Sequence, residues 1–187
     1  LGDRPQRQLR FDLVDGTVIT GRIDARTIAI RIATGNVLKI PVADMKELIV
    51  GLNDRPGFVK RVETLVKALD SHRKREDVRR ELIALGPAAA PIVKRQGASV
   101  TSSRRGTVAE VLKAYETWSA DHPNAPEALV RPLEPRSGVR ADVNTFMGTI
   151  TVKEFRIASP YGRVAVKLDD VRRVSPGFQA TSGKVGQ

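Results

Sequence analysis

The sequence predicts an α+β protein in which a duplicated small antiparallel β unit, a barrel or half-sandwich, flanks an insert of four helices. The main observation is a repeat, because residues 37–51 (VLKIPVADMKELIVG) align without a gap with residues 163–177 (RVAVKLDDVRRVSPG). In both copies apolar residues occupy every second position, which is typical of a strand with one buried face. Over residues 55–120, between the copies, apolar residues recur instead at the spacing of a helix face. We therefore expect β structure at both ends of the chain and helices in between.

Length and composition restrict the class of protein. A chain of 187 residues suits one domain of good size or two to three small ones. The sequence has no cysteine, which excludes disulfides, thiolate catalysis and cysteine-ligated metals. It has no run of about 18 uninterrupted apolar residues, so no membrane insertion is expected. Because the chain begins with Leu1, a removed targeting segment stays open, and no compartment is predicted.

The chain is strongly basic, with a formal net charge of +11. Residues 52–120 carry 14 basic and 8 acidic side chains, which supplies +6 of this charge. A basic surface favours anionic partners such as nucleic acid, acidic protein faces or lipid headgroups. The alternative is a solvated basic face that only keeps the protein soluble.

The first β unit is expected over residues 9–51. Asp15-Gly16 indicates a tight hairpin, because a type I′ turn needs positive φ. Pro41 has no N–H, so its position is expected to be unpaired or at a sheet edge. The expected strands are residues 9–13, 18–23, 27–34, 37–42 and 46–50, with one helical turn at residues 42–45.

This unit resembles an SH3-like or Sm-like small barrel, which has five short strands and a turn of helix before the last. Asp15-Gly16 followed by Gly21 matches the Sm-type L-x-D-G-x-x-x-x-G opening. The resemblance implies a small closed β fold and covers about 43 residues, 9–51.

Four helices are expected in residues 55–120. Pro56-Gly57 opens the first, Asp70-Ser71 caps the second and Gly86-Pro87 ends it. The third is expected at residues 88–96 and the fourth from residue 107, after a flexible loop at residues 97–106.

This helical segment resembles a bacterial HEAT-type repeat over about 60 residues, 58–118. The residues that carry the pattern are Leu65, Leu69, Arg75, Leu82, Leu85, Gly86, Ala89, Pro91 and Ile92. Stacked repeats generally need about three units to be stable, and this segment has fewer. The resemblance therefore implies that the helices pack on the β parts or on another chain.

The remaining chain is expected to form a proline-rich linker (121–138), a second β unit (139–177) and a flexible tail (178–187). In the second unit, Phe146–Ile150 matches Ile19–Ile23, and Phe155–Ser159 matches Ile30–Thr34. Two arrangements stay open at this point. Each copy closes its own small barrel, or the two copies pair across a pseudo-twofold axis and complete one sandwich.

No catalytic, cofactor or metal site is predicted. The two histidines, His72 and His122, lie in a charged turn and in the linker, where surface positions are expected. Asp169-Asp170 is interpreted as a turn cap, and Glu76-Asp77 as an acidic helix start. The sequence contains neither a G-x-G-x-x-G nor a Walker-type phosphate-binding motif.

The densest cationic cluster lies on the helical insert. If the helix turns align, these side chains form one basic rim that contacts an anionic partner. The candidate residues are Arg73, Lys74, Arg75, Arg79, Arg80, Lys94, Arg95, Arg104 and Arg105. Arg75 has a structural alternative, since it occupies a position of the repeat pattern.

Three functions stay open. The preferred one is a non-enzymatic scaffold or assembly protein that binds a protein partner, or itself, through β edges and the basic helical face. The second is a nucleic-acid-binding module that uses the basic helical rim; no aromatic residues are interleaved with the cations to stack bases. The third is an enzyme whose site is completed by another chain.

Overall fold

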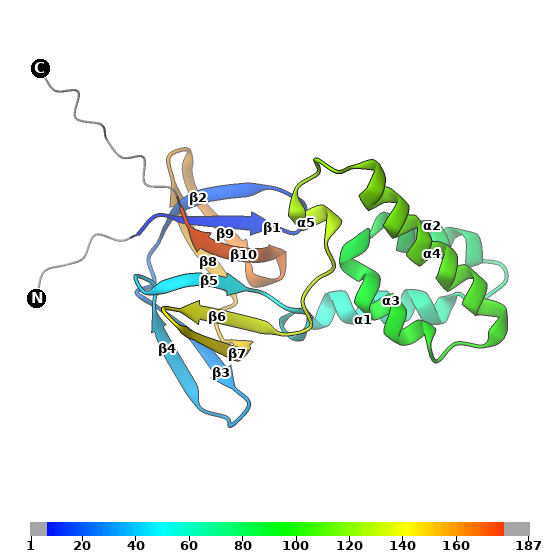
Figure 1. Cartoon of the computed structure of the whole chain (residues 1–187), viewed down its shortest axis with the longest axis horizontal. Helices are drawn as coiled ribbons and strands as arrows, with labels where there is room; N and C mark the ends of the chain where they lie inside the picture. Colours follow the sequence, from blue (N-terminus) through cyan, green and yellow to red (C-terminus); the bar gives the residue numbers. More distant parts are fainter. Residues whose placement is uncertain (1–6, 178–187) are drawn as a thin grey trace, which may run out of the picture.

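The computed structural model describes residues 7–177, and the predicted tail of residues 178–187 lies outside this range. The chain forms a sheet lobe and a helical lobe that lie end to end (Figure 1). The strands are β1 (Leu9–Leu13), β2 (Val18–Ile23), β3 (Thr27–Ile32), β4 (Val37–Pro41), β5 (Met45–Ile49), β6 (Ser137–Ala141), β7 (Asn144–Ile150), β8 (Glu154–Ser159), β9 (Gly162–Lys167) and β10 (Val171–Pro176).

All ten strands belong to one antiparallel sheet in the order β4-β3-β7-β6-β5-β10-β1-β2-β8-β9. The predicted fold class is therefore wrong, because the two β stretches are not separate units on either side of a four-helix insert. The hairpin β3–β4 leaves β2 and pairs with β7 instead, and the hairpin β8–β9 pairs with β2. Each half of the sheet thus contains strands from both ends of the chain.

The sheet has an internal pseudo-twofold symmetry. The strands β1–β5 of the first copy are equivalent, in order, to β6–β10 of the second. When each strand is replaced by its equivalent, the result is the same strand order read from the opposite edge of the sheet. The axis passes between Leu48 and Val174, which hold the same position in the two copies and pair directly across β5 and β10. Beside them, Arg173 bonds Glu47 at 2.8 Å, although these two residues are also equivalents. The duplicated position has therefore diverged into a complementary pair of charges.

One hydrophobic core connects the exchanged strands. Leu9 and Phe11 from the first copy and Phe155 and Ile157 from the second are buried in the same cluster. The rings of Phe11 and Phe155 lie 5.5 Å apart at an angle of 58°. The apolar residues that alternate along each strand thus bury one face of the sheet, as the period of two predicts.

The helical lobe has its own core. It contains α1 (Pro56–Ala68), α2 (Arg75–Ala84), α3 (Ala90–Gly97), α4 (Ser102–Asp121) and the short α5 (Glu127–Val130). Buried residues from α1 to α4 form its interior, including Val66, Leu82, Ile92 and Val111. The predicted loop at 97–106 is too long, since α4 already begins at Ser102. Where one helical turn was predicted, residues 42–44 form a short turn with two successive i→i+3 bonds, from the N–H of Asp44 to Pro41 (3.0 Å) and from that of Met45 to Val42 (3.3 Å).

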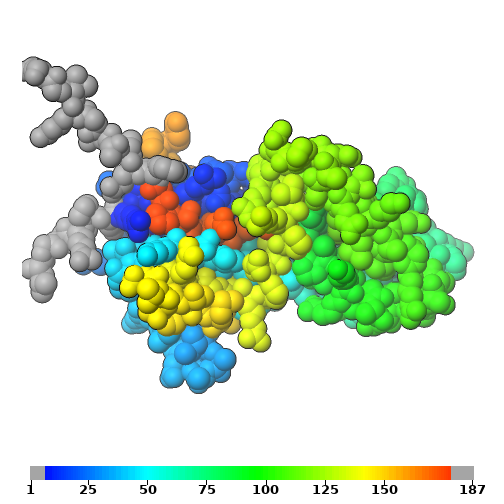
Figure 2. Space-filling model, in the orientation of Figure 1, coloured from blue at the N-terminus to red at the C-terminus, as the bar shows by residue number. Residues whose placement is uncertain are grey.

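The segment between β5 and α1 fixes the two lobes together. Asn53 donates to the carbonyl of Gly148 (2.8 Å) and accepts the backbone N–H of Ser137 (2.7 Å). The carboxylate of Asp54 accepts the N–H of Ile150 (2.9 Å). Arg55 follows and is 1% exposed. The space-filling view shows the helical lobe covering one end of the sheet lobe (Figure 2).

Candidate functional site

The structure brings the α1–α2 turn and the start of α4 together. Arg104, in the first turn of α4, forms an ion pair with Asp70 in the turn that follows α1. This pair places the exposed Arg73 and Lys74 of the turn on the same end of the helical lobe as Arg105. Lys94 and Arg95 lie on α3, whose end leads into α4 through residues 98–101.

Several of the predicted rim cations already bind partners within the chain. Arg79 bonds Glu76 (2.7 Å), and Arg80 bonds Asp77 (3.1 Å). These carboxylates lie in the first turn of α2, where the acidic helix start was predicted. The hydrogen bond between Arg79 and Glu76 lowers the pKa of Glu76 and raises the pKa of Arg79.

Two further rim residues bind neighbouring helices or turns. Arg95 bonds Glu63 of α1 at 3.1 Å. Arg75 donates to the carbonyl of Leu69 (3.1 Å), which is the structural role that the sequence left open. Within residues 7–177, the rim cations without an ion pair or side-chain hydrogen bond are Arg73, Lys74, Lys94 and Arg105.

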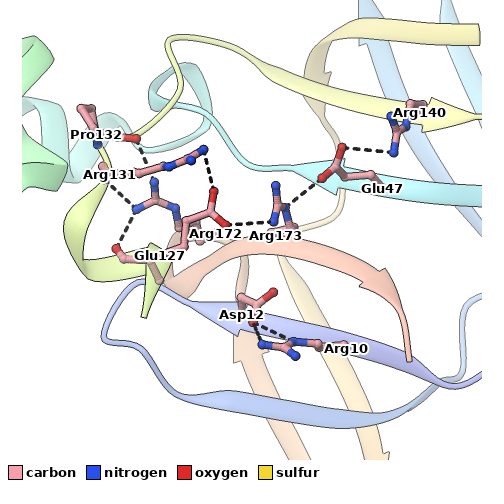
Figure 3. Close-up of polar contacts among 10 residues, drawn as sticks. Arg10, Asp12, Glu47, Glu127, Arg131, Pro132, Arg140, Arg172 and Arg173 are labelled. Carbon is pink, nitrogen blue, oxygen red and sulfur yellow. Dashed lines mark hydrogen bonds and ion pairs between the residues drawn. The ribbon is translucent and has the colours of Figure 1, made fainter. Parts of the chain in front are cut away.

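A groove of about 650 Å³ lies between the sheet and the segment around α5. Arg172, on β10, donates to the carbonyls of Ala128 (2.6 Å), Arg131 (2.9 Å) and Pro132 (2.9 Å) (Figure 3). Its burial lowers the pKa of Arg172. Arg173 bonds both Glu47 and Glu127 in the same groove. These bonds attach the predicted linker to the sheet and leave the arginines satisfied, so the groove is a structural contact.

The two ends of the sheet are the edge strands β4 and β9. Figure 1 shows their hairpins projecting from opposite sides of the sheet lobe. Pro41 lies on β4, which confirms that it is at an edge. The two edges are equivalents, but they differ in what they offer to an added strand.

The backbone hydrogen bonds between β3 and β4 show which groups of β4 face outward. Just after β4, the N–H of Val42 donates to the carbonyl of Arg26, and just before it, the carbonyl of Asn36 accepts from the N–H of Ile32. Because backbone groups alternate in direction along a strand, residues 37, 39 and 41 face away from β3. Pro41 occupies one of these outward positions and removes its donor.

On β9 the same alternation leaves every outward donor in place. The N–H of Leu168 donates to Lys153 at 2.8 Å, so residues 166, 164 and 162 face β8. The backbone N–H and C=O groups of Arg163, Ala165 and Lys167 face outward and have no partner strand among the described residues. Lys167 holds the position that Pro41 occupies in the first copy. The β9 edge is therefore open where the β4 edge is blocked.

The side chains at this edge also lack cover. Val164 is 40% exposed and Tyr161, in the turn before β9, is 100% exposed. Tyr161 stands at the tip of a hairpin held by Ser159, whose hydroxyl donates to the carbonyl of Gly162 (2.9 Å). Exposed apolar and aromatic side chains beside unpaired backbone are typical of a surface that accepts another strand.

The two histidines and the Asp169-Asp170 pair have structural surroundings. His122 stacks on Trp118 with ring centres 4.4 Å apart, while His72 is exposed in the α1–α2 turn. The backbone carbonyls of Asp169 and Asp170 accept bonds from Arg55 and Val14. Neither carboxylate has a hydrogen bond to a described residue, so the predicted side-chain cap is not formed. Within residues 7–177, no group of three or more His, Asp or Glu side chains is placed to hold a metal ion.

No helix in the described part of the chain is long and apolar enough to cross a membrane. None of the family models, characterised proteins or solved structures compared with the chain matches it. The resemblance to HEAT repeats thus stays a prediction. The Sm-like closed unit predicted over residues 9–51 is wrong, because β1 pairs with β10 and β3 with β7 of the second copy. The functional argument therefore rests on the geometry.

The sequence pointed to edge strands in general but did not single out β9. One signal was available, namely the difference between Pro41 and Lys167 at equivalent positions of the repeat. The strand exchange, which puts β9 at the end of the sheet, has no such local signal.

Proposed function

We propose that this protein is a non-enzymatic assembly protein that binds an extended segment of a partner protein along β9. The observation that carries the proposal is the row of three outward N–H and C=O pairs at Arg163, Ala165 and Lys167. Added strands bind such edges mainly through backbone hydrogen bonds, and alternate side chains supply specificity. The exposed Val164 beside this row gives an incoming strand apolar surface to cover.

Lys167→Pro tests the proposal, because it places a proline on β9 at the position where Pro41 already blocks the β4 edge. Lys167 has φ −68° and ψ 148°, which proline adopts without strain. Its N–H faces away from β8, so the substitution removes no bond of the ladder. Random linear peptides would be selected on the immobilised full chain, and the recovered peptides titrated against the wild type and the variant.

We expect Lys167→Pro to weaken the selected peptides about tenfold or more, since one hydrogen bond is lost and the ring obstructs the added strand. Lys167→Ala is the matched control, because it removes the charge and keeps the N–H. Thermal unfolding of all three proteins checks that the fold is retained. Equal binding to the wild type and Lys167→Pro, or a selection that recovers no binder, would contradict edge binding.

The basic helical rim supports nucleic-acid binding as a second candidate. Its support is the set of four cations without an ion-pair partner in residues 7–177: Arg73, Lys74, Lys94 and Arg105. The ion pairs of Arg79, Arg80, Arg95 and Arg104 weaken this support, because a paired cation neutralises fewer phosphates.

A further inference from the structure

We infer that the segment bound by β9 comes from a different protein and is acidic, with carboxylate side chains alternating with apolar ones. This inference rests on the proposed edge binding and adds the chemistry of the partner. It follows from the two rows of side chains that flank an added strand, one on each face of the sheet.

The outer row is cationic. Residues with outward backbone groups on β9 also direct their side chains to the exposed face of the sheet, which carries Arg163, Ala165 and Lys167. Arg156 on β8 stands opposite Ala165, and Arg22 on β2 continues the row of Ala158 and Arg163. The one carboxylate on this face of the three strands is Glu154, which pairs with Arg156 at 3.5 Å. A strand added here places every second side chain beside an excess of positive charge.

The inner row is apolar. Val164 and Val166 direct their side chains toward the core, where Val166 is 4% exposed and Val164 40%. Val164 is uncovered because no described strand lies beyond β9. An added strand would close this row with apolar side chains at alternate positions, in the register opposite to its carboxylates.

The same charges disfavour a second copy of this chain as the occupant. Antiparallel pairing of two β9 strands centred on Ala165 places Arg163 opposite Lys167 of the other copy, twice. Like charges directly opposite each other destabilise a strand pair. The other edge, β4, offers Val37, Lys39 and Pro41 on the corresponding face, so it supplies no carboxylate and lacks one donor. The partner that fits β9 is therefore a different chain.

Two synthetic peptides test the inference on the full-length protein. The first alternates valine with glutamate, and the second replaces each glutamate with lysine. Binding of the fluorescently labelled peptides would be measured by anisotropy at low and high salt. We expect the glutamate peptide to bind about tenfold tighter or more at low salt, because favourable cross-strand charge pairs replace unfavourable ones. This preference should shrink at high salt, since the charges are exposed.

A double variant, Arg163→Glu with Lys167→Glu, should reverse the preference, and Lys167→Pro should weaken both peptides. Equal affinity for the two peptides with loss on Lys167→Pro overturns the acidic preference and leaves edge binding intact. Failure of both peptides to bind overturns the inference. Edge binding itself is tested separately, by the selection of random peptides on the full chain. Dimerisation of the unliganded chain that Lys167→Pro abolishes would show that the occupant is a second copy.

Discussion

Arg55 is the residue on which the junction of the two lobes depends. Its guanidinium donates to the carbonyls of Val50, Asp169 and Val171. Val50 directly follows β5, Asp169 lies in the turn before β10, and Val171 is the first residue of β10. Burial lowers the pKa of Arg55 to about 10, so the side chain stays charged at neutral pH. The planar fork of a guanidinium presents five donors in fixed directions, whereas a lysine ammonium presents three donors from a single nitrogen. One side chain thus joins the first turn of the helical lobe to the pseudo-twofold centre of the sheet.

Arg55→Ala is expected to lower the free energy of unfolding by roughly 3 kcal/mol, because it leaves buried carbonyls without donors and opens a cavity. Arg55→Lys keeps the charge but loses the fork, and roughly 1–2 kcal/mol is expected. Urea unfolding followed by circular dichroism measures both values. The exposed Arg61 in α1 gives the control, since its ion pair with Glu81 (2.9 Å) lies at the surface. An Arg55→Ala protein as stable as Arg61→Ala would show that the junction does not need this residue.

At this scale the sequence predicted surface chemistry better than buried chemistry. The acidic start of α2 and the edge position of Pro41 follow from local rules and are confirmed. Arg55 gave no signal, because an arginine before proline at a helix start looks like an ordinary exposed residue. Its burial is set by carbonyls that lie more than a hundred positions away in the chain, at Asp169 and Val171.

Two equivalent glycines permit the exchange of hairpins between the copies. Gly21 on β2 faces the backbone of Ala158 on β8, and Gly148 on β7 faces that of Arg31 on β3. A Cβ atom at Gly21 would lie 2.5 Å from the carbonyl oxygen of Ala158, and one at Gly148 would lie 2.0 Å from that of Arg31. Both contacts involve backbone atoms of the exchanged hairpin, so no side-chain rotation relieves them.

Gly21→Ala and Gly148→Ala should each lower the free energy of unfolding by roughly 2–3 kcal/mol, since the paired strands must separate locally. Gly106→Ala is the matched control, because Gly106 lies inside α4 with no atom near its added Cβ. That substitution is expected to raise stability by roughly 0.5–1 kcal/mol. Thermal and urea unfolding compare the three. A neutral result at both β positions would mean that the strands do not approach as closely as the exchange requires.

Most individual elements could be predicted from the sequence, since they depend on local periodicity and turn residues. Strands β1 and β2 have the predicted limits, and the helix after Pro56 begins as expected. The residue-by-residue equivalence of the two copies was predicted less accurately. The sheet register makes Ile157 the equivalent of Ile30, whereas the sequence alignment had assigned that place to Phe155. A shift of two residues keeps the same side chains inside, so alternation alone cannot detect it.

The whole molecule is where prediction from sequence failed. Each copy contains the pattern of a small β fold, and that pattern is equally satisfied whether a hairpin pairs with its own β2 or with the β2 equivalent of the other copy. The choice depends on the pairing of β5 with β10 at the centre and on the helical lobe between the copies. The divergence of Glu47 and Arg173 into an ion pair stabilises this centre, where two identical charged residues would repel each other.

The exchange predicts that neither copy folds without the other. A chain ending at residue 138 lacks β7 to β10 and all but two residues of β6, so β3 loses β7, β2 loses β8 and β1 loses β10. We expect it to lose the native structure of all five remaining strands, because each half of the sheet contains strands from both copies. A chain ending at Gly177, which keeps all ten strands, is the matched control. Amide hydrogen exchange measured by NMR distinguishes the outcomes, since folded strands protect their amides. Native-like protection of β1 to β5 in the shorter chain, at a concentration where it is monomeric, would show that the first copy folds alone and that the exchange is not obligatory.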